Sequence, residues 1–254
     1  MDFWFIFYLI FGVFIIVFFI LALPRKKSER VPNIEAIDNP DVVEAFERMA
    51  STPPFKLLRR KVISTIRKLN PIGTLVDVGC GSGNLIIQIA KKFSNLDLIG
   101  IDLSEAIIAT AIKSADDNGV NKNIKFEIGT VEKLPFPDDS IEFIVSTLSL
   151  HHWSDPLTSF KEIFRVLRRN GTCLVFDFRR NSRKFFYGLL TFATKIVVPK
   201  ALKRINEPLG SLKAAYNASE IFQILSEIPF IEVEIKAYLA WMFIKIKKSY
   251  HNLS

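Results

Sequence analysis

Strand-like and helical segments alternate along most of this chain, and this alternation restricts the fold more than any other feature. Short apolar runs occur at TLVDVG, LDLIGID, IKFEIG, IEFIVST and GTCLVFDF. Most of the segments between them have helical periodicity, as in PLTSFKEIFRVLRR. The pattern predicts an α/β fold in which a doubly wound parallel sheet carries helices on both faces.

The C-terminal end of the chain departs from this alternation. IEVEIKA and AWMFIKIK are two strand-like runs with only Tyr238 and Leu239 between them. So short a connection joins antiparallel strands, so we expect a hairpin at this end of the sheet. Before the sheet, Asp41–Leu69 contains two helical stretches that are separated by STPPF.

A long apolar segment begins almost at the N-terminus. Phe3–Leu23 contains no charged residue, and as a helix it would be about 30 Å long, the thickness of the hydrocarbon core of a bilayer. A cleaved signal peptide is the alternative, but the segment lacks a basic start, its apolar core is too long and no small-residue cleavage site follows. The sequence therefore predicts a transmembrane helix before the α/β fold, within an anchor over residues 1–24.

Positive charge follows this segment directly. The basic residues are Arg25, Lys26, Lys27 and Arg30. By the positive-inside rule they place the rest of the chain in the cytoplasm, so the predicted localisation is a single-pass membrane protein with its N-terminus outside. We expect residues 25–40 to form a basic juxtamembrane tether and residues 41–254 to form the folded domain.

A glycine-rich turn interrupts the first strand-to-helix connection, in the run LVDVGCGSGNL. A dinucleotide-binding turn would read G-x-G-x-x-G, whereas Gly79, Gly81 and Gly83 give G-x-G-x-G and Asn84 stands at the third expected glycine. No lysine follows the glycines, which excludes a P-loop. The turn therefore predicts a ligand at the carboxyl edge of the sheet, but not an ordinary dinucleotide.

Two carboxylates flank this turn. Asp77 lies inside the apolar run, where a buried charge is costly unless a cation or several donors meet it. A pyrophosphate would be repelled by Asp77, whereas the ammonium and sulfonium groups of S-adenosylmethionine would be attracted. Asp102 ends the second strand in GIDLS and suits the two hydroxyls of a ribose, which both cofactors carry.

Four motifs in order make the chain resemble the class I S-adenosylmethionine-dependent methyltransferases. They are VDVGCGSGNL, GIDLS, GTVEKLPFPDDSIEFIVSTLSLHHW and SFKEIFRVLRRNGTCLVFDF. They are most similar to the type 11 methyltransferase domain, whose members include quinone-biosynthesis and lipid methyltransferases. The resemblance covers about Thr74–Asp177 and implies a Rossmann-like seven-stranded sheet that ends in the antiparallel hairpin. It also implies that residues 41–254 are a methyltransferase domain.

The resemblance further implies a cofactor site for S-adenosylmethionine. Asp77 would hold the methionine ammonium, Asp102 the ribose hydroxyls, and Leu103 one face of the adenine. Where the family commonly has an aspartate for the adenine amino group, this chain has Thr130, whose hydroxyl can accept one hydrogen bond. The predicted cofactor-binding residues are Asp77, Gly79, Cys80, Gly81, Gly83, Asp102, Leu103, Thr130, Val131, Glu132, Ser146 and Thr147. No metal is expected.

Two adjacent histidines follow the fourth strand, on the side where this family binds its substrate. A carbon or phenol acceptor usually needs a base, whereas an acceptor that is already nucleophilic needs only alignment with the methyl group. His151 and His152 are therefore catalytic candidates. The alternative is that one ring satisfies a backbone carbonyl at the start of a helix and that Trp153 packs beneath it.

Basic residues are concentrated between Leu157 and Ala215, where 13 Lys and Arg face three acids. Many of them lie around Phe185–Arg204, within a basic, apolar insertion over residues 179–215. Such a segment is typical of a surface that lies on anionic lipid, and the predicted anchor favours that interpretation. The alternative is a substrate lid with solvated lysines. Nucleic acid is not an expected partner, because the segment is rich in aromatic and aliphatic residues.

These observations together predict a membrane-anchored methyltransferase that methylates a small hydrophobic acceptor, lipid-like or quinone-like. A non-catalytic, membrane-bound domain of the same fold remains the alternative from another class, with Thr130 as its hint. A nicotinamide-dependent oxidoreductase is disfavoured by Asp77 and by the missing third glycine. The sequence leaves the acceptor atom open.

Overall fold

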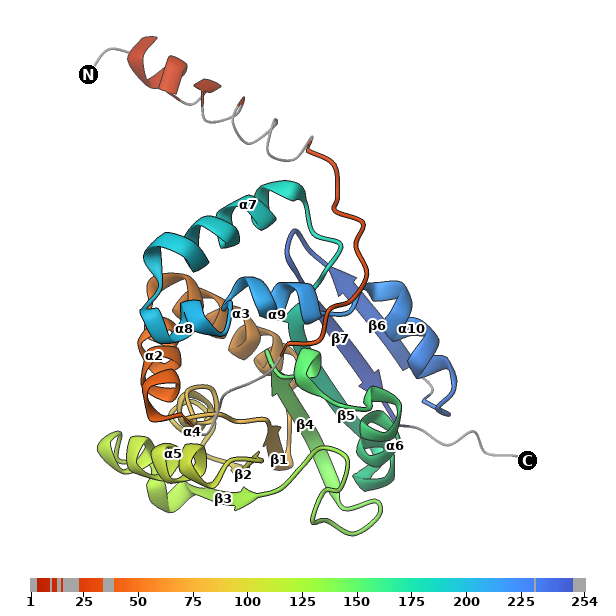
Figure 1. The fold of residues 1–254 in the computed structure, drawn as a ribbon. Coiled ribbons are helices and arrows are strands. Elements are labelled where there is room, and N and C mark those ends of the chain that lie inside the picture. The colour runs from red at the N-terminus through yellow and green to blue at the C-terminus, as the bar shows by residue number, and fades with distance from the viewer. Residues whose placement is uncertain are drawn as a thin grey trace.

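A seven-stranded mixed sheet forms the centre of the protein in a computed structural model that describes residues 4–9, 11–12, 15, 23–33, 39–230 and 232–248 (Figure 1). The strand order is β3-β2-β1-β4-β5-β7-β6. The strands are β1 (Gly73–Val78), β2 (Leu96–Asp102), β3 (Ile124–Ile128), β4 (Ile141–Thr147), β5 (Leu167–Phe178), β6 (Glu232–Ala237) and β7 (Trp241–Lys247).

The direction in which each strand pairs follows from the length of its connection to the next strand. β1 to β5 run parallel to one another, and β7 lies between β5 and β6 and is antiparallel to both. In the β6–β7 hairpin, the backbone N–H of Tyr238 donates to the carbonyl of Trp241 at 2.8 Å. The predicted Rossmann-like α/β sheet and its C-terminal hairpin are thus confirmed.

Helices connect these strands and cover both faces of the sheet. They are α2 (Pro40–Ala50), α3 (Pro53–Leu69), α4 (Ile86–Ala90), α5 (Glu105–Asp117), α6 (Pro156–Val166), α7 (Lys184–Phe192), α8 (Lys200–Arg204), α9 (Leu209–Ala214) and α10 (Ala218–Ser226). Shorter turns are the 3₁₀ helices η1 (Asn121–Asn123) and η2 (Leu150–His152) and the π-helix η3 (Ala193–Val197).

Capping residues explain several of these boundaries. Ser104 caps α5, and Asp155 caps α6 by accepting two backbone N–H groups ahead of a proline at the first helical turn. Asn217 and Glu220 form a capping box at the start of α10. The helical periodicity of PLTSFKEIFRVLRR extends three residues too far, because Leu167 is already extended and pairs with Ile141 as the start of β5.

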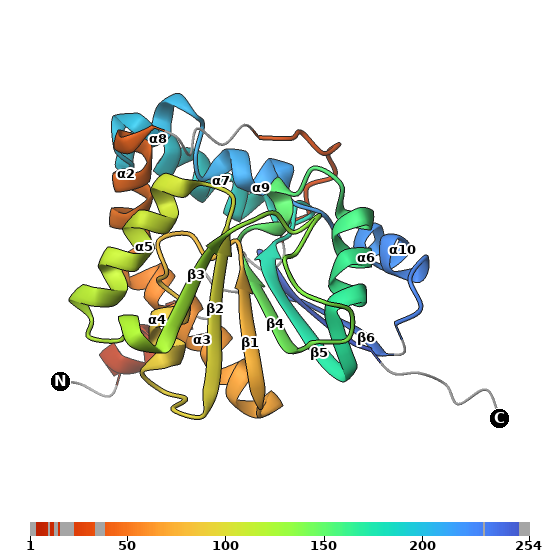
Figure 2. The ribbon, with the colours of Figure 1, turned by 90° about the horizontal axis from the view of Figure 1, so that it is seen from below.

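Two apolar clusters, one on each face, hold the layers together. Helices α3, α4 and α5 pack on one face and α6 and α10 on the other, as Figure 2 shows. Buried residues of the first cluster include Ile66 and Ile86, and those of the second include Phe160 and Leu225. Because both faces are covered, β1 and β4 have no exposed residue, and β5 is buried or half-buried from Gly171 onward.

The predictions about the N-terminal segment need a correction. Of Phe3–Leu23, only residues 4–9, 11–12, 15 and 23 are described, and the remainder of the predicted anchor lies outside the described residues. Among the described residues, no helix has the length and apolar character that crossing a bilayer requires. The predicted transmembrane helix and the predicted single-pass membrane localisation with a cytoplasmic domain are therefore wrong.

The basic insertion folds back onto the domain. It contains α7, η3, α8 and α9, which lie with α2 across one end of the sheet (Figure 2). Leu202 of α8 is fully buried against Val42 and Ala45 of α2. This position fits the substrate-lid interpretation of Phe185–Arg204. The lipid-surface interpretation came from the basic and apolar composition of the segment and was favoured by the predicted anchor, which is not found among the described residues.

Candidate active site

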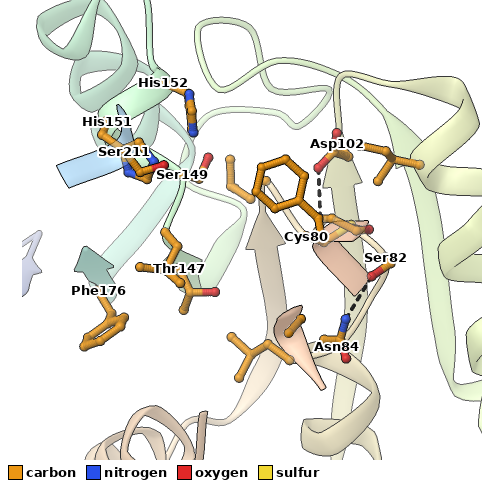
Figure 3. A pocket seen from close by; sticks show the side chains of 18 of the residues that line it. Cys80, Ser82, Asn84, Asp102, Thr147, Ser149, His151, His152, Phe176 and Ser211 are labelled. Carbon is orange, nitrogen blue, oxygen red and sulfur yellow. Dashed lines mark hydrogen bonds between the residues drawn. The ribbon is translucent and has the colours of Figure 1, made fainter. Parts of the chain in front are cut away.

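A cavity of about 530 Å³ opens at the carboxyl ends of β1, β2, β4 and β5 (Figure 3). It is lined by most of the residues predicted to bind the cofactor and by both candidate histidines. Asp77, Gly83 and Ser146 do not line it. The parallel strands bring these segments together, because their carboxyl ends meet at one edge of the sheet.

The glycine turn forms one wall of the cavity. Gly79, Gly81 and Gly83 have φ values of 70°, 54° and 78°, a region that side-chain-bearing residues rarely adopt. A Cβ at Gly79 would lie 2.3 Å from the hydroxyl oxygen of Ser149, whereas a Cβ at Gly81 would meet no atom within 4 Å. Position 79 therefore accepts only glycine, because a Cβ there would clash with Ser149. The backbone at Gly81 has open space beside it, which a ligand can occupy.

Asp102 braces this turn from the end of β2. Its Oδ2 accepts a hydrogen bond from the N–H of Gly81 at 2.9 Å, and its Oδ1 accepts one from the N–H of Ser104 at 3.2 Å. Each carboxylate oxygen has more than one lone pair. The carboxylate can therefore hold the turn and also accept hydroxyls of a ligand in the cavity.

Asp77 lies behind the same turn. Its side chain is 1% exposed, and neither carboxylate oxygen has a hydrogen-bond partner among the described residues. Burial, and then the charge of Asp102, raise the pKa of Asp77 to about 8. An isolated buried carboxylate of this kind is stabilised by a cation. The ammonium and sulfonium of S-adenosylmethionine fit that requirement.

The remaining predicted cofactor residues lie around the turn. Leu103 is 61% exposed and lines the cavity, as Thr130, Val131 and Glu132 do. Cys80 lines it too, and burial raises the pKa of its thiol, so it is a packing residue rather than a thiolate. Thr147 lines the cavity, while the neighbouring Ser146 is fully buried in β4.

His151 forms a buried pair with Asp177 at the end of β5. His151 Nδ1 lies 2.7 Å from Asp177 Oδ1, and the backbone N–H of His151 donates to Oδ2 at 2.9 Å. A carboxylate only accepts, so Nδ1 carries the proton in this pair. The ring of His152 lies beside it, with centroids 4.0 Å apart. The geometry is that of a histidine whose tautomer is held by a carboxylate, leaving Nε2 on the opposite side of the ring.

Helices before the first strand line the other end of the cavity, and sequence reasoning did not assign them to the site. They supply a largely apolar wall together with two phenylalanines of β5. The apolar residues are Val43, Phe46, Met49, Phe55, Leu58, Val62, Phe176 and Phe178. Arg59 also lines this end, donates to the carbonyl of Ala50 at 2.8 Å, and has its pKa lowered by burial.

Two buried carboxylates were missed as well. Asp177 was identifiable in the sequence by the argument applied to Asp77, since both are acids at the end of an apolar strand. Glu207 is 2% exposed, lines the cavity and accepts a hydrogen bond from the hydroxyl of Ser211 at 2.6 Å. No local pattern marks Glu207, because it lies in a connection between two short helices.

Known proteins match this chain over the same region. A family model described as a methyltransferase domain matches residues 70–215. The ubiquinone/menaquinone biosynthesis C-methyltransferase UbiE of Rickettsia bellii is 28% identical over 199 residues, which are 76% of this chain and 77% of that protein. The uncharacterized methyltransferase YcgJ of Bacillus subtilis is 34% identical over 103 residues, covering 41% of this chain and 40% of that protein.

Solved structures share the fold. A proposed S-adenosylmethionine-dependent methyltransferase of Methanococcus maripaludis has a TM-score of 0.66 at 24% identity, covering 90% of this chain and 100% of that one. The plantazolicin methyltransferase BpumL, in complex with a pentazolic desmethylPZN analog and SAH, has a TM-score of 0.65 at 16% identity, covering 84% of this chain and 93% of that one.

The matches and the geometry agree on the reaction class. The Asp77 carboxylate, which has no hydrogen-bond partner among the described residues, fits the cationic groups of S-adenosylmethionine and does not fit the pyrophosphate of a dinucleotide. The open backbone at Gly81 and the carboxylate of Asp102 are compatible with the same cofactor. Because the family model spans more than half of the chain, the protein belongs to the methyltransferase-domain family and is an S-adenosylmethionine-dependent methyltransferase.

Proposed function

We propose that this enzyme methylates a small hydrophobic acceptor with a quinol-like ring. The observation that carries the proposal is the continuity of one cavity, which runs from the glycine turn to the apolar wall and is also lined by His151, the partner of the buried Asp177. Phe46, Met49 and Leu58 offer that wall to an apolar ligand. Relatives that span most of this chain are named as C-methyltransferases of ubiquinone and menaquinone biosynthesis, which supports an acceptor of this kind.

The cofactor end of the cavity would hold S-adenosylmethionine through the residues that the sequence singles out. Asp77 would face the methionine ammonium, Asp102 would accept the ribose hydroxyls, and Leu103 would cover the adenine. Thr130 would accept a hydrogen bond from the adenine amino group. When bound, this cofactor supplies an electrophilic methyl group whose carbon–sulfur bond breaks as the acceptor's electron pair attacks.

The acceptor end would supply the base. His151 Nε2 would take the proton of an acceptor hydroxyl, which makes the ring electron-rich enough to attack the methyl carbon. The attacked ring carbon would then lose its own proton to solvent, and the imidazolium would return a proton to the ring oxygen, which restores the quinol. Asp177 would hold the Nδ1–H and stabilise the imidazolium that forms. The apolar side chains would exclude water and align the acceptor, and alignment is the main requirement of an in-line displacement.

Methyl transfer to a defined panel tests this function. The purified protein is incubated with methyl-labelled S-adenosylmethionine and short-tailed benzoquinols and naphthoquinols that lack one ring methyl group. Polar phenols and amines of similar size serve as the comparison. We expect label on the apolar quinols, with its position determined by mass spectrometry. Label only on the polar compounds, or no label on any quinol, would overturn the proposal.

A further inference from the structure

The segment Arg25–Asn33 lies before the fold in sequence but on it in space, and we call it the strap. Arg25 forms an antiparallel bridge with Arg183, and the N–H of Lys26 donates to the carbonyl of Ser182 at 2.9 Å. Further along, the N–H of Val31 donates to the carbonyl of Lys213 at 3.2 Å. Figure 1 shows this orange stretch passing α7 and running toward α9.

Arg30 joins the strap to the histidine turn. Its Nε donates to the carbonyl of Ala214 at 2.6 Å, and its Nη2 donates to the carbonyl of His151 at 3.0 Å. The guanidinium also lies over the ring of Tyr216, 4.3 Å from its centroid. The planar guanidinium of Arg30 therefore connects the end of α9 to η2, and its two rigidly spaced N–H groups set the distance between the two carbonyls.

Asn33 joins the strap to the buried carboxylate of the cavity. Its Nδ2 donates to Glu207 Oε1, while Glu207 Oε2 accepts from Ser211 at 2.6 Å. The Asn33 side chain also lies against the backbone of α9, where a Cβ at Gly210 would come within 2.5 Å of its Nδ2. The glycine thus provides the space that lets Asn33 reach Glu207.

We propose that Arg30 and Asn33 are positioning residues of the active site, which hold the His151 turn and the Glu207 carboxylate in place at the acceptor end of the cavity. The inference rests on the proposed function, because it takes this end as the site of the acceptor. The hydrogen bonds of the strap reach η2, Glu207 and α9. A displacement of about 1 Å at a reacting group can lower a rate by about a hundredfold.

Three variants test the strap against a matched control. Arg30→Ala removes the link to the histidine turn and Asn33→Ala the link to Glu207. Gly210→Ala expels the Asn33 side chain while adding a better helix former to α9. Lys27→Ala changes an exposed residue of the same strap and is the control. We expect each test variant to lower kcat by about tenfold to a hundredfold, with the KM of the acceptor and the affinity for S-adenosylhomocysteine within about threefold of wild type.

Hydrogen–deuterium exchange gives a readout that does not depend on the acceptor. Arg30→Ala should speed exchange over residues 148–154, and Asn33→Ala and Gly210→Ala over residues 206–212, with the glycine turn at 79–83 unchanged in all. Unchanged exchange in those segments, or a parallel loss of S-adenosylhomocysteine binding, would overturn the proposal. Failure of the proposed function would appear differently, as absent transfer to the quinols by the wild-type protein.

Discussion

The two ends of the cavity are built in different ways. At the cofactor end, the groups come from a few short turns at the ends of neighbouring strands and are held by local contacts between those turns, as in the hydrogen bond from the Gly81 N–H to the Asp102 carboxylate. At the acceptor end, side chains converge from α2, α3, β5, η2 and the connection before α9. The geometry of the first end depends on a few short segments, whereas the geometry of the second depends on the packing of several distant elements. The comparison suggests a constant cofactor end and an adaptable acceptor end.

The charges differ in the same way. Asp77 and Asp102 make the cofactor end acidic, which suits a ligand with two cationic groups. The acceptor end is mostly apolar, and its polar groups are held in pairs, as in His151–Asp177 and Glu207–Ser211. Substitutions at the cofactor end should therefore change cofactor affinity, and substitutions at the acceptor end should change kcat or the KM of the acceptor.

The largest loss of kcat without a loss of cofactor affinity is expected at the His151–Asp177 pair. Asp177→Asn keeps the shape of the side chain but removes the charge that stabilises the imidazolium, and His151→Asn removes the base. We expect each to lower kcat by a factor of about 10²–10⁴, with S-adenosylhomocysteine affinity unchanged by calorimetry. Asp116→Asn, on the exposed face of α5, is the control. A loss of cofactor affinity as large as the loss of kcat would contradict the assignment of this pair to the acceptor end.

Asp77 should make the cofactor end sensitive to pH. The pKa of Asp77 in the folded protein, about 8, lies above its value in the unfolded chain. The unfolding free energy is therefore unaffected by this carboxyl below about pH 4 and falls as the pH rises from about 4 to about 8. At pH 7 the raised pKa of Asp77 lowers the unfolding free energy by up to about 4 kcal/mol. Asp77→Asn should therefore raise the unfolding free energy of the cofactor-free protein at pH 7 and not at pH 4, as denaturant titrations would show.

The same carboxylate should link cofactor binding to proton release. A bound ammonium favours the ionised form of Asp77, so binding near pH 7 should release a large part of one proton. Calorimetry in two buffers of different ionisation enthalpy measures that release, and Asp77→Asn should abolish it while weakening binding. Proton release that persists in the variant would assign it to another group.

A smaller effect is expected from Asp102. Asp102→Asn removes the charge from the hydrogen bonds to the ribose and to the turn, each of which contributes about 1.5–3 kcal/mol when charge-assisted. The affinity for S-adenosylhomocysteine should fall by about 10- to 100-fold, with the KM of the acceptor unchanged. Asp97→Asn, at an exposed position of the same strand, should bind as the wild type does. Equal losses in both variants would refute a specific role.

The smallest effect is expected from the apolar wall. Leu58 lines the cavity and the adjacent Leu57 is 67% exposed, so the two leucines of α3 form a matched pair. Leu58→Ala removes apolar surface at about 0.8 kcal/mol per methylene, so the KM of a quinol acceptor should rise by about tenfold. Leu57→Ala should leave it unchanged. Equal KM values in the two variants would place the acceptor elsewhere.

Much of the fold was predictable because its signals are local. The central strands are apolar runs that must be buried whatever surrounds them. Helix starts are marked by Ser104, Asp155 and Asn217 through hydrogen bonds within three residues. The boundary at Leu167 was missed because its extended conformation depends on pairing with Ile141, which is distant in sequence. The transmembrane interpretation of Phe3–Leu23 rested on the length and the apolar composition of the segment, whereas no helix among the described residues is long and apolar enough to cross a bilayer.

The strands, the glycine turn and the residues predicted at the cofactor end could be read from the chain, because strand, turn and carboxylate follow one another within a few positions. The acceptor end could not, because the fold brings together His151, Glu207 and the apolar side chains of α2 and α3 from distant parts of the chain. The tertiary structure also decided the role of Arg30, which the sequence shows as one cation of a basic cluster and the fold places between His151 and Ala214. Such contacts join residues more than 100 positions apart, so the path of the folded chain creates them and no local pattern records them.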